Sequence, residues 1–234
     1  MTGSLLLIPS TLGDTPPEDV LPLSVLEHIR STRFFIVEQS KAARAFLKSC
    51  NLPVPQQEIH VVELDKHDEQ QDLDDFLYPA LSGHNIGLLS DAGCPGVADP
   101  GARVVALAHR KGIPVKPLIG PSSLLLALMA SGLEGQRFCF NGYLPIDRNE
   151  RMKKVQQLED RALRLKETQL FIETPYRNNG MIEDLLRSLA GTTRLCLAAD
   201  LSTSNEWVRT LTVREWKSNV PDLHKRPCVF LVGA

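Results

Sequence analysis

The sequence lacks the excess of basic residues that dedicated nucleic-acid-binding proteins usually carry. It has 26 Lys and Arg against 28 Asp and Glu, which gives a net charge of −2. Because neutralisation of phosphates by Lys and Arg supplies most of the affinity for nucleic acid, any such binding must come from a local basic patch. The rest of the composition, 43% hydrophobic and 23% charged, predicts a folded protein with a sizeable core.

Long apolar runs and clusters of metal-binding residues are also missing. The longest apolar run, Leu124 to Ala130, is far shorter than the roughly 18 to 20 residues that span a bilayer, and the first strand-length run lacks the basic flank of an export signal. The five cysteines show no CxxC spacing and the six histidines form no cluster with them. We therefore expect reduced thiols, a cytoplasmic protein, no membrane partner and no built-in metal site.

Three common nucleotide and hydrolase motifs are absent. The chain has no GxGxxG after a predicted strand, no GxxxxGK[ST] and no GxSxG. Each motif supplies a backbone shape that its chemistry requires, a phosphate cradle in the first two and an exposed nucleophile in the third. Their absence argues against ordinary Rossmann dehydrogenases, P-loop NTPases and α/β-hydrolases.

What the sequence does contain is an alternation of strand-length apolar runs with helical stretches, which predicts an α/β protein. Predicted strands are 4–8, 34–38, 59–63, 86–90, 115–119, 138–140, 169–173, 194–199, 210–213 and 229–232. Predicted helices are 20–31, 41–50, 102–111, 124–131, 148–166 and 179–190. The acidic stretch Asp65 to Asp75 reads as the solvated start of a further helix that reaches about Ser82.

The order of these elements predicts two α/β lobes, residues 1–118 and 119–234, each a mostly parallel sheet flanked by helices. No low-complexity linker separates them. A ligand cleft between the lobes is expected by default.

The segment Ser90 to Gly101, SDAGCPGVADPG, follows a predicted buried strand and holds three glycines and two prolines. Glycine lets a backbone approach a ligand closely and proline fixes the shape of a loop. Because ligands bind at the carboxyl ends of strands in α/β sheets, this loop is a candidate binding site, with a simple tight turn as the alternative.

This loop resembles the SDAGTPxxxDPG motif of the tetrapyrrole methylase superfamily, the class III S-adenosylmethionine-dependent methyltransferases. Within it, the sequence is most similar to the ribosomal RNA small subunit methyltransferase I family, the 16S rRNA cytidine 2'-O-methyltransferases. Four further segments resemble that family in the same order along the chain: LLIPSTLGD at 6–14, VEQSK at 37–41, IGPSS at 119–123 with ASGL at 130–133, and RFCFNGYLP at 137–145.

The resemblance implies a methyltransferase that binds S-adenosylmethionine between the lobes, largely through backbone groups, without a metal. Carried over by position, it implies cofactor contacts at ten residues: Pro9, Gly93, Cys94, Val97, Ser122, Ser123, Glu173, Ala198, Pro227 and Cys228. It also implies a homodimer, with RNA or the small ribosomal subunit as the methyl acceptor.

Two carboxylates are candidates for the group that orients or deprotonates a ribose hydroxyl, which is a poor nucleophile. Glu38 lies at the end of a predicted strand and Asp99 lies in the loop. Each has a structural alternative, as a partner of loop amides or of a helix start.

The chain departs from the family at Cys94, where the motif has Thr, and at Gln39 to Lys41, where the family has Asp-Thr-Arg. It ends at Ala234, where members of that family usually continue. These differences leave three functional hypotheses: an RNA 2'-O-methyltransferase, a methyltransferase for a tetrapyrrole precursor or other small molecule, and an inactive protein that binds the cofactor.

Overall fold

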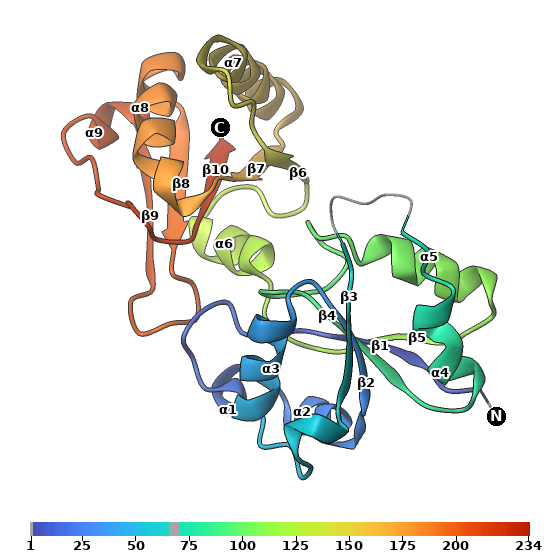
Figure 1. Ribbon diagram of the computed structural model, residues 1–234. Helices are drawn as coiled ribbons and strands as arrows, with labels where there is room; N and C mark the ends of the chain where they lie inside the picture. Colours follow the sequence, from blue (N-terminus) through green and yellow to red (C-terminus); the bar gives the residue numbers. More distant parts are fainter. Residues whose placement is uncertain (1, 66–70) are drawn as a thin grey trace. The chain divides into compact units, whose positions relative to one another are not determined.

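The computed structural model describes residues 2–65 and 71–234 (Figure 1). The chain packs as two compact units, Met1–Ser122 and Ser123–Ala234. Each contains one five-stranded sheet. The predicted lobe boundary, between residues 118 and 119, lies four residues before the boundary between these units.

The first sheet consists of buried, strand-length apolar segments, as the alternation predicts. Its strands are β1 (Leu5–Ile8), β2 (Phe34–Val37), β3 (His60–Glu63), β4 (Ile86–Leu89) and β5 (Val115–Pro117). Their order is β3-β2-β4-β1-β5 and all neighbouring pairs are parallel. Because β1 and β4 are central and carry almost only Leu, Ile and Gly, they read in the sequence as uninterrupted apolar runs.

Helices cover both faces of this sheet. They are α1 (Pro17–Val20), α2 (Leu23–Ser31), α3 (Ser40–Ser49), α4 (Tyr78–Leu81) and α5 (Ala102–Arg110), with short 3₁₀ turns η1 (Gln56–Glu58) and η2 (Asp75–Leu77). The predicted helix over 20–31 is wrong at its start. Pro22 is the N-cap of α2, because proline fixes φ and lacks the N–H that a continuous helix would need.

The second sheet corrects the prediction of two mostly parallel sheets. Its strands are β6 (Phe138–Tyr143), β7 (Thr168–Ile172), β8 (Arg194–Ala199), β9 (Trp207–Thr212) and β10 (Cys228–Gly233), in the order β6-β7-β10-β8-β9. Only β6 and β7 are parallel, and the other three pairs are antiparallel. Strand direction depends on the path of the connections, and the apolar pattern of a buried strand carries no sign of it.

Helices pack on the two faces of the second sheet. They are α6 (Ser123–Ser131), α7 (Arg148–Leu165), α8 (Asn178–Ser188) and the single turn α9 (Val213–Trp216), with the 3₁₀ turn η3 (Pro175–Arg177). Phe230 and Val232 of β10 belong to the core beneath α7 and α8. Gly233 faces the opposite way, where a Cβ would come 2.9 Å from Leu133, the second residue after α6.

The predicted helix that begins in the acidic stretch is found only at its end, as η2 and α4, while residues 66–70 of that stretch lie outside the described residues. Among the residues that the structure describes, no helix is both long and apolar enough to cross a membrane.

Candidate functional site

The carboxyl ends of β1, β2 and β4 meet at one edge of the first sheet, because these strands are parallel neighbours. Glu38 follows β2, Ser10 lies two residues after β1, and Ser90 begins the loop after β4. The Asp91 amide donates a hydrogen bond of 3.1 Å to Glu38 Oε1. This hydrogen bond joins Glu38, one of the two candidate catalytic carboxylates, to the glycine-rich loop at a residue 53 positions away in the sequence.

The beginning of that loop is tied to the end of β1. The Ser10 amide donates to the Gly93 carbonyl at 2.9 Å, within an isolated antiparallel bridge between the two residues. The Ser10 hydroxyl donates to the Ser90 carbonyl at 3.1 Å. Ser10 and Ser90 are both buried, so their hydroxyls act inside the protein and hold Gly93 against the sheet edge.

Asp99 braces the rest of the loop. Its Oδ1 accepts hydrogen bonds from the Gly96 amide at 2.7 Å and the Gly101 amide at 2.8 Å. Burial raises the pKa of the Asp99 carboxyl, an effect that these two hydrogen bonds oppose and the neighbouring Asp91 adds to. Because Oδ1 already accepts hydrogen bonds from two loop amides, this arrangement suits a role of Asp99 in fixing the shape of the loop.

Two glycines of the loop have left-handed backbones, with φ of +74° at Gly93 and +81° at Gly96. At Gly96 no described atom lies within 4 Å of the place where a Cβ would be, so a ligand can reach the main chain there. Val97, the next residue, is 49% exposed. An accessible backbone beside an exposed apolar side chain suits a cofactor that is bound mainly by main-chain groups and whose rings contact that side chain.

Cys94 and Pro9 connect this loop to the turn after β5. The Cys94 thiol donates to the Pro121 carbonyl at 3.4 Å, and burial raises the pKa of this thiol, with Asp99 adding to the effect. Pro9 is buried, and a Cβ at Gly120 would come 2.2 Å from its Cγ. The structure thus brings together Pro9, Gly93, Cys94 and the turn that ends at Ser122.

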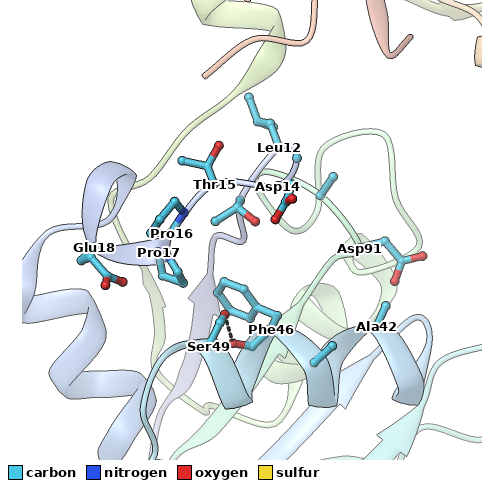
Figure 2. Close-up of a pocket in the computed structure, with 14 residues that line it drawn as sticks. Leu12, Asp14, Thr15, Pro16, Pro17, Glu18, Ala42, Phe46, Ser49 and Asp91 are labelled. Atoms are coloured by element: carbon cyan, nitrogen blue, oxygen red, sulfur yellow. Dashed lines mark hydrogen bonds between the residues drawn. The ribbon is translucent and has the colours of Figure 1, made fainter. Parts of the chain in front are cut away.

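A cavity of about 580 Å³ lies beside the glycine-rich loop in the first unit (Figure 2). The β1–α2 segment, one face of α3 and the start of the loop form its walls. Fourteen residues line it: Thr11, Leu12, Gly13, Asp14, Thr15, Pro16, Pro17, Glu18, Ala42, Ala45, Phe46, Ser49, Asp91 and Ala92. Neither Glu38 nor Asp99 lines it, but Asp91, which is bonded to Glu38, does.

The remaining predicted residues belong to the second unit. Ser123 begins α6, while Glu173, Ala198 and Cys228 gather where β7 ends and β10 begins, since Val229 lies opposite both Ile172 and Ala198.

Hydrogen bonds and an ion pair fix this edge of the second sheet. The carboxylate of Glu173 is buried and accepts from the Thr174 amide at 2.7 Å, and its other oxygen lies 2.8 Å from an Arg177 guanidinium nitrogen. The Pro227 carbonyl accepts from the Asp200 amide at 2.9 Å. Burial raises the pKa of the Cys228 thiol. These contacts give the edge a fixed shape, with the thiol neutral.

Sequence reasoning missed the residues that shape the cavity, chiefly Asp14, Phe46 and Asp91. Asp91 lies two residues after β4 and Asp14 six residues after β1, and these positions after central strands could have identified them. Phe46 gave no such signal, because in the sequence it reads only as part of the apolar face of α3. Within residues 2–65 and 71–234, no three His, Cys, Asp or Glu side chains form a group that could hold a metal ion.

Comparisons with known proteins give consistent results. The family described as Tetrapyrrole (Corrin/Porphyrin) Methylases matches residues 15–217. Proteins named ribosomal RNA small subunit methyltransferase I are similar to the chain along nearly its whole length. The one from Pseudomonas aeruginosa is 28% identical over 99% of this chain and 79% of its own length, and the one from Vibrio cholerae is 29% identical over 97% and 76%. Among solved structures, the methyltransferase CobJ is similar with a TM-score of 0.65 and 17% identity, over 99% of this chain and 94% of that one.

Proposed function

Because the chain belongs to the tetrapyrrole (corrin/porphyrin) methylase family and is a methyltransferase, we propose that it transfers a methyl group from S-adenosylmethionine to a ribose 2'-hydroxyl of a cytidine in small-subunit ribosomal RNA. The observation that carries this proposal is the similarity, over nearly the whole chain, to proteins named for methylating that RNA. S-adenosylmethionine supplies an electrophilic methyl group on a sulfonium sulfur, so the chain's main tasks are binding and orientation.

The proposed cofactor contacts in the first unit are the backbone at Pro9, Gly93, Cys94 and Ser122, together with the exposed side chain of Val97. Three features support them: the two left-handed glycines, the uncovered backbone at Gly96 and the bracing by Asp99. Cys94 in place of threonine is compatible with this role, because its side chain turns to the Pro121 carbonyl.

In the second unit we propose Ser123, Glu173, Ala198, Pro227 and Cys228 as further contacts, on the strength of the family resemblance. Glu173 would act through its backbone or as a fixed negative charge, since Arg177 and the Thr174 amide already bind its two oxygens.

Glu38 is the proposed group that orients the acceptor hydroxyl or takes its proton. One oxygen accepts from the Asp91 amide, which fixes the carboxylate at the sheet edge beside the loop. Asp99 is better suited to positioning the loop, because its Oδ1 is engaged by two amides. Replacing Glu38 with Gln keeps an oxygen for the Asp91 amide and removes the base, so turnover should fall about 100-fold or more while cofactor affinity stays the same. Unchanged turnover would exclude Glu38 as the base.

We also propose a cytoplasmic homodimer. The ribosomal substrate favours the cytoplasm, and the five cysteines are free thiols, as expected in a reducing compartment. The dimer rests on the family resemblance, and light scattering of the purified protein would test it.

The experiment that tests the function is transfer of labelled methyl from S-adenosylmethionine to small-subunit particles from cells that lack this protein. Label in a single cytidine of the small-subunit RNA would support the proposal. Calorimetric binding of S-adenosylmethionine without any label in the particles would contradict the ribosomal role and favour a small-molecule acceptor. Absence of cofactor binding would contradict the cofactor proposal itself.

A further inference from the structure

The cavity beside the glycine-rich loop lies next to the backbone that we propose to bind the cofactor. Asp91 and Ala92 line it, and the next two residues, Gly93 and Cys94, belong to the proposed cofactor-binding backbone. Its volume of about 580 Å³ falls within the range of sites that bind small molecules and can hold one nucleoside.

The charge of the lining excludes a phosphate as the group that enters. Asp14, Glu18 and Asp91 contribute three carboxylates, and no Lys or Arg is among the fourteen lining residues. Carboxylates accept hydrogen bonds and repel anions, so the cavity suits a group that presents N–H donors.

Asp14 and Phe46 are the side chains best placed to hold such a group. Figure 2 shows Phe46 on the α3 side of the cavity and Asp14 across from it, on the segment that follows β1, with the Asp14 carboxylate directed toward the space between them. Phe46 packs at its base against the core of the first unit, and a hydrogen bond from Ser49 to its carbonyl at 2.7 Å fixes this turn of α3. Asp14 is exposed, and its carboxylate has no hydrogen-bond or ion-pair partner among the described residues. An aromatic face opposite an available carboxylate matches a nucleobase with an exocyclic amino group.

Two lysines flank the cavity on the same helix. Lys41 and Lys48 are separated by seven residues, two turns of α3, and Ala45 of the cavity wall lies between them on the same side. Both are exposed, and neither forms an ion pair within the described part of the chain. The two lysines form a short basic edge beside the negatively charged cavity. The net charge of the whole chain, −2, gives no sign of this local basic edge.

We propose that this cavity binds the base of the acceptor nucleoside, with Phe46 stacking on it and Asp14 accepting a hydrogen bond from its exocyclic amino group, while Lys41 and Lys48 bind the flanking phosphates. This inference rests on the proposed function and states how the acceptor is recognised. Asp14 is then a specificity-determining residue: it favours an amino-bearing base such as cytosine over uracil, whose O4 can only accept a hydrogen bond.

The test uses labelled methyl transfer to small-subunit particles reconstituted with either cytidine or uridine at the acceptor position. The wild-type protein should prefer cytidine by about 10-fold or more in kcat/KM, since a hydrogen bond to a charged group contributes that much. Asp14→Ala should lose most of this preference, and Asp14→Asn should keep part of it. Phe46→Leu, which keeps an apolar side chain of similar reach, should lower kcat/KM about fivefold or more for both particles. Glu27→Ala, an exposed acid on α2, is the control and should behave like wild type.

The lysines are tested by particle binding at increasing salt. The double variant Lys41→Ala, Lys48→Ala should bind more weakly and reduce the slope of log affinity against log salt by about 2, whereas Lys116→Ala on β5 should leave the slope unchanged. Calorimetry should give the same affinity for S-adenosylmethionine in every variant.

The outcomes separate the two proposals. The cavity assignment is wrong if the wild type methylates the cytidine particles, Asp14→Ala keeps the preference for cytidine, and Phe46→Leu keeps the wild-type kcat/KM. The proposed function would stand in that case. If the wild type binds S-adenosylmethionine but labels neither particle, both proposals are wrong.

Discussion

Replacing Asp99 tests whether this residue shapes the glycine-rich loop or acts as the proposed base. Two variants, Asp99→Ala and Asp99→Asn, both remove the negative charge but differ in whether an oxygen remains to accept the amide hydrogen bonds. Asp99→Ala removes the oxygen that accepts from the Gly96 and Gly101 amides at 2.7 and 2.8 Å. Asp99→Asn keeps an oxygen in that place and removes only the negative charge.

The structure sets the size of each effect. A hydrogen bond to a charged acceptor contributes about 1.5–3 kcal/mol, and water will replace part of it in a half-buried loop. We therefore expect Asp99→Ala to lower the free energy of unfolding by about 2–3 kcal/mol and to weaken S-adenosylmethionine binding. Asp99→Asn should cost less than about 1 kcal/mol, because both amides keep an acceptor.

The pH dependence of these variants has a defined sign. Burial raises the pKa of Asp99 in the folded protein, so ionising this carboxyl costs stability as the pH rises above its unfolded pKa. Asp99→Asn removes that cost. Its stability relative to wild type should therefore improve from acidic pH to pH 7.

Three measurements check this reasoning: unfolding in urea followed by circular dichroism at several pH values, hydrogen exchange of the peptide that spans the loop, and turnover. Asp99→Ala should speed exchange in the loop by about 10-fold or more, while Asp99→Asn should turn over within a few-fold of wild type. A loss of turnover of 100-fold or more in Asp99→Asn, with stability and cofactor affinity intact, would refute the positioning role and identify Asp99 as the base.

Two further substitutions test the packing and a third tests the Cys94 thiol. Asp184 is buried and pairs with two arginines of α7 at 2.6 and 2.8 Å. Asp184→Asn should therefore lower the free energy of unfolding of the second unit by about 3 kcal/mol, as followed by tryptophan fluorescence, since Trp207 and Trp216 both lie in that unit; a loss below 1 kcal/mol contradicts a buried ion pair. Gly120→Ala forces a methyl group against a rigid proline ring and should cost about 1–3 kcal/mol in urea unfolding, whereas Gly135→Ala, which meets no described atom within 4 Å, should stay within 0.5 kcal/mol. Equal effects of the two would show that the turn relaxes freely. Cys94→Ala should keep turnover within a few-fold, because burial keeps the thiol protonated; complete loss of activity would indicate a covalent role.

Most elements could be read from the sequence because their physical signals are local. The strand 194–199 has the predicted bounds, α7 ends one residue before the predicted helix, and α3 begins and ends one residue earlier than predicted. Uninterrupted apolar runs identify buried strands, and apolar residues at helical spacing identify helix faces. The error at 20–31 also has a local cause, because apolar residues continue across Pro22, where the helix α2 has its N-cap.

The candidate site was predictable only in part. The loop after β4 stood out because it combines glycine and proline at a strand end, and Glu38 because a charged residue follows an apolar run. For Asp99 the sequence left two roles open, a catalytic carboxylate or a partner of loop amides, and it gave no role for Asp91. Both roles depend on which amide or carboxylate each residue meets after folding.

The sequence by itself determined the α/β class, the family and the loop that is the candidate cofactor site, since strand and helix periodicity and the motif residues are properties of neighbouring positions. Only the tertiary structure decided the antiparallel order of the second sheet, the bracing role of Asp99 and the cavity between Asp14 and Phe46. These depend on chain direction and on contacts between residues tens of positions apart, and an apolar run or a single carboxylate has the same appearance in the sequence whichever partner it meets.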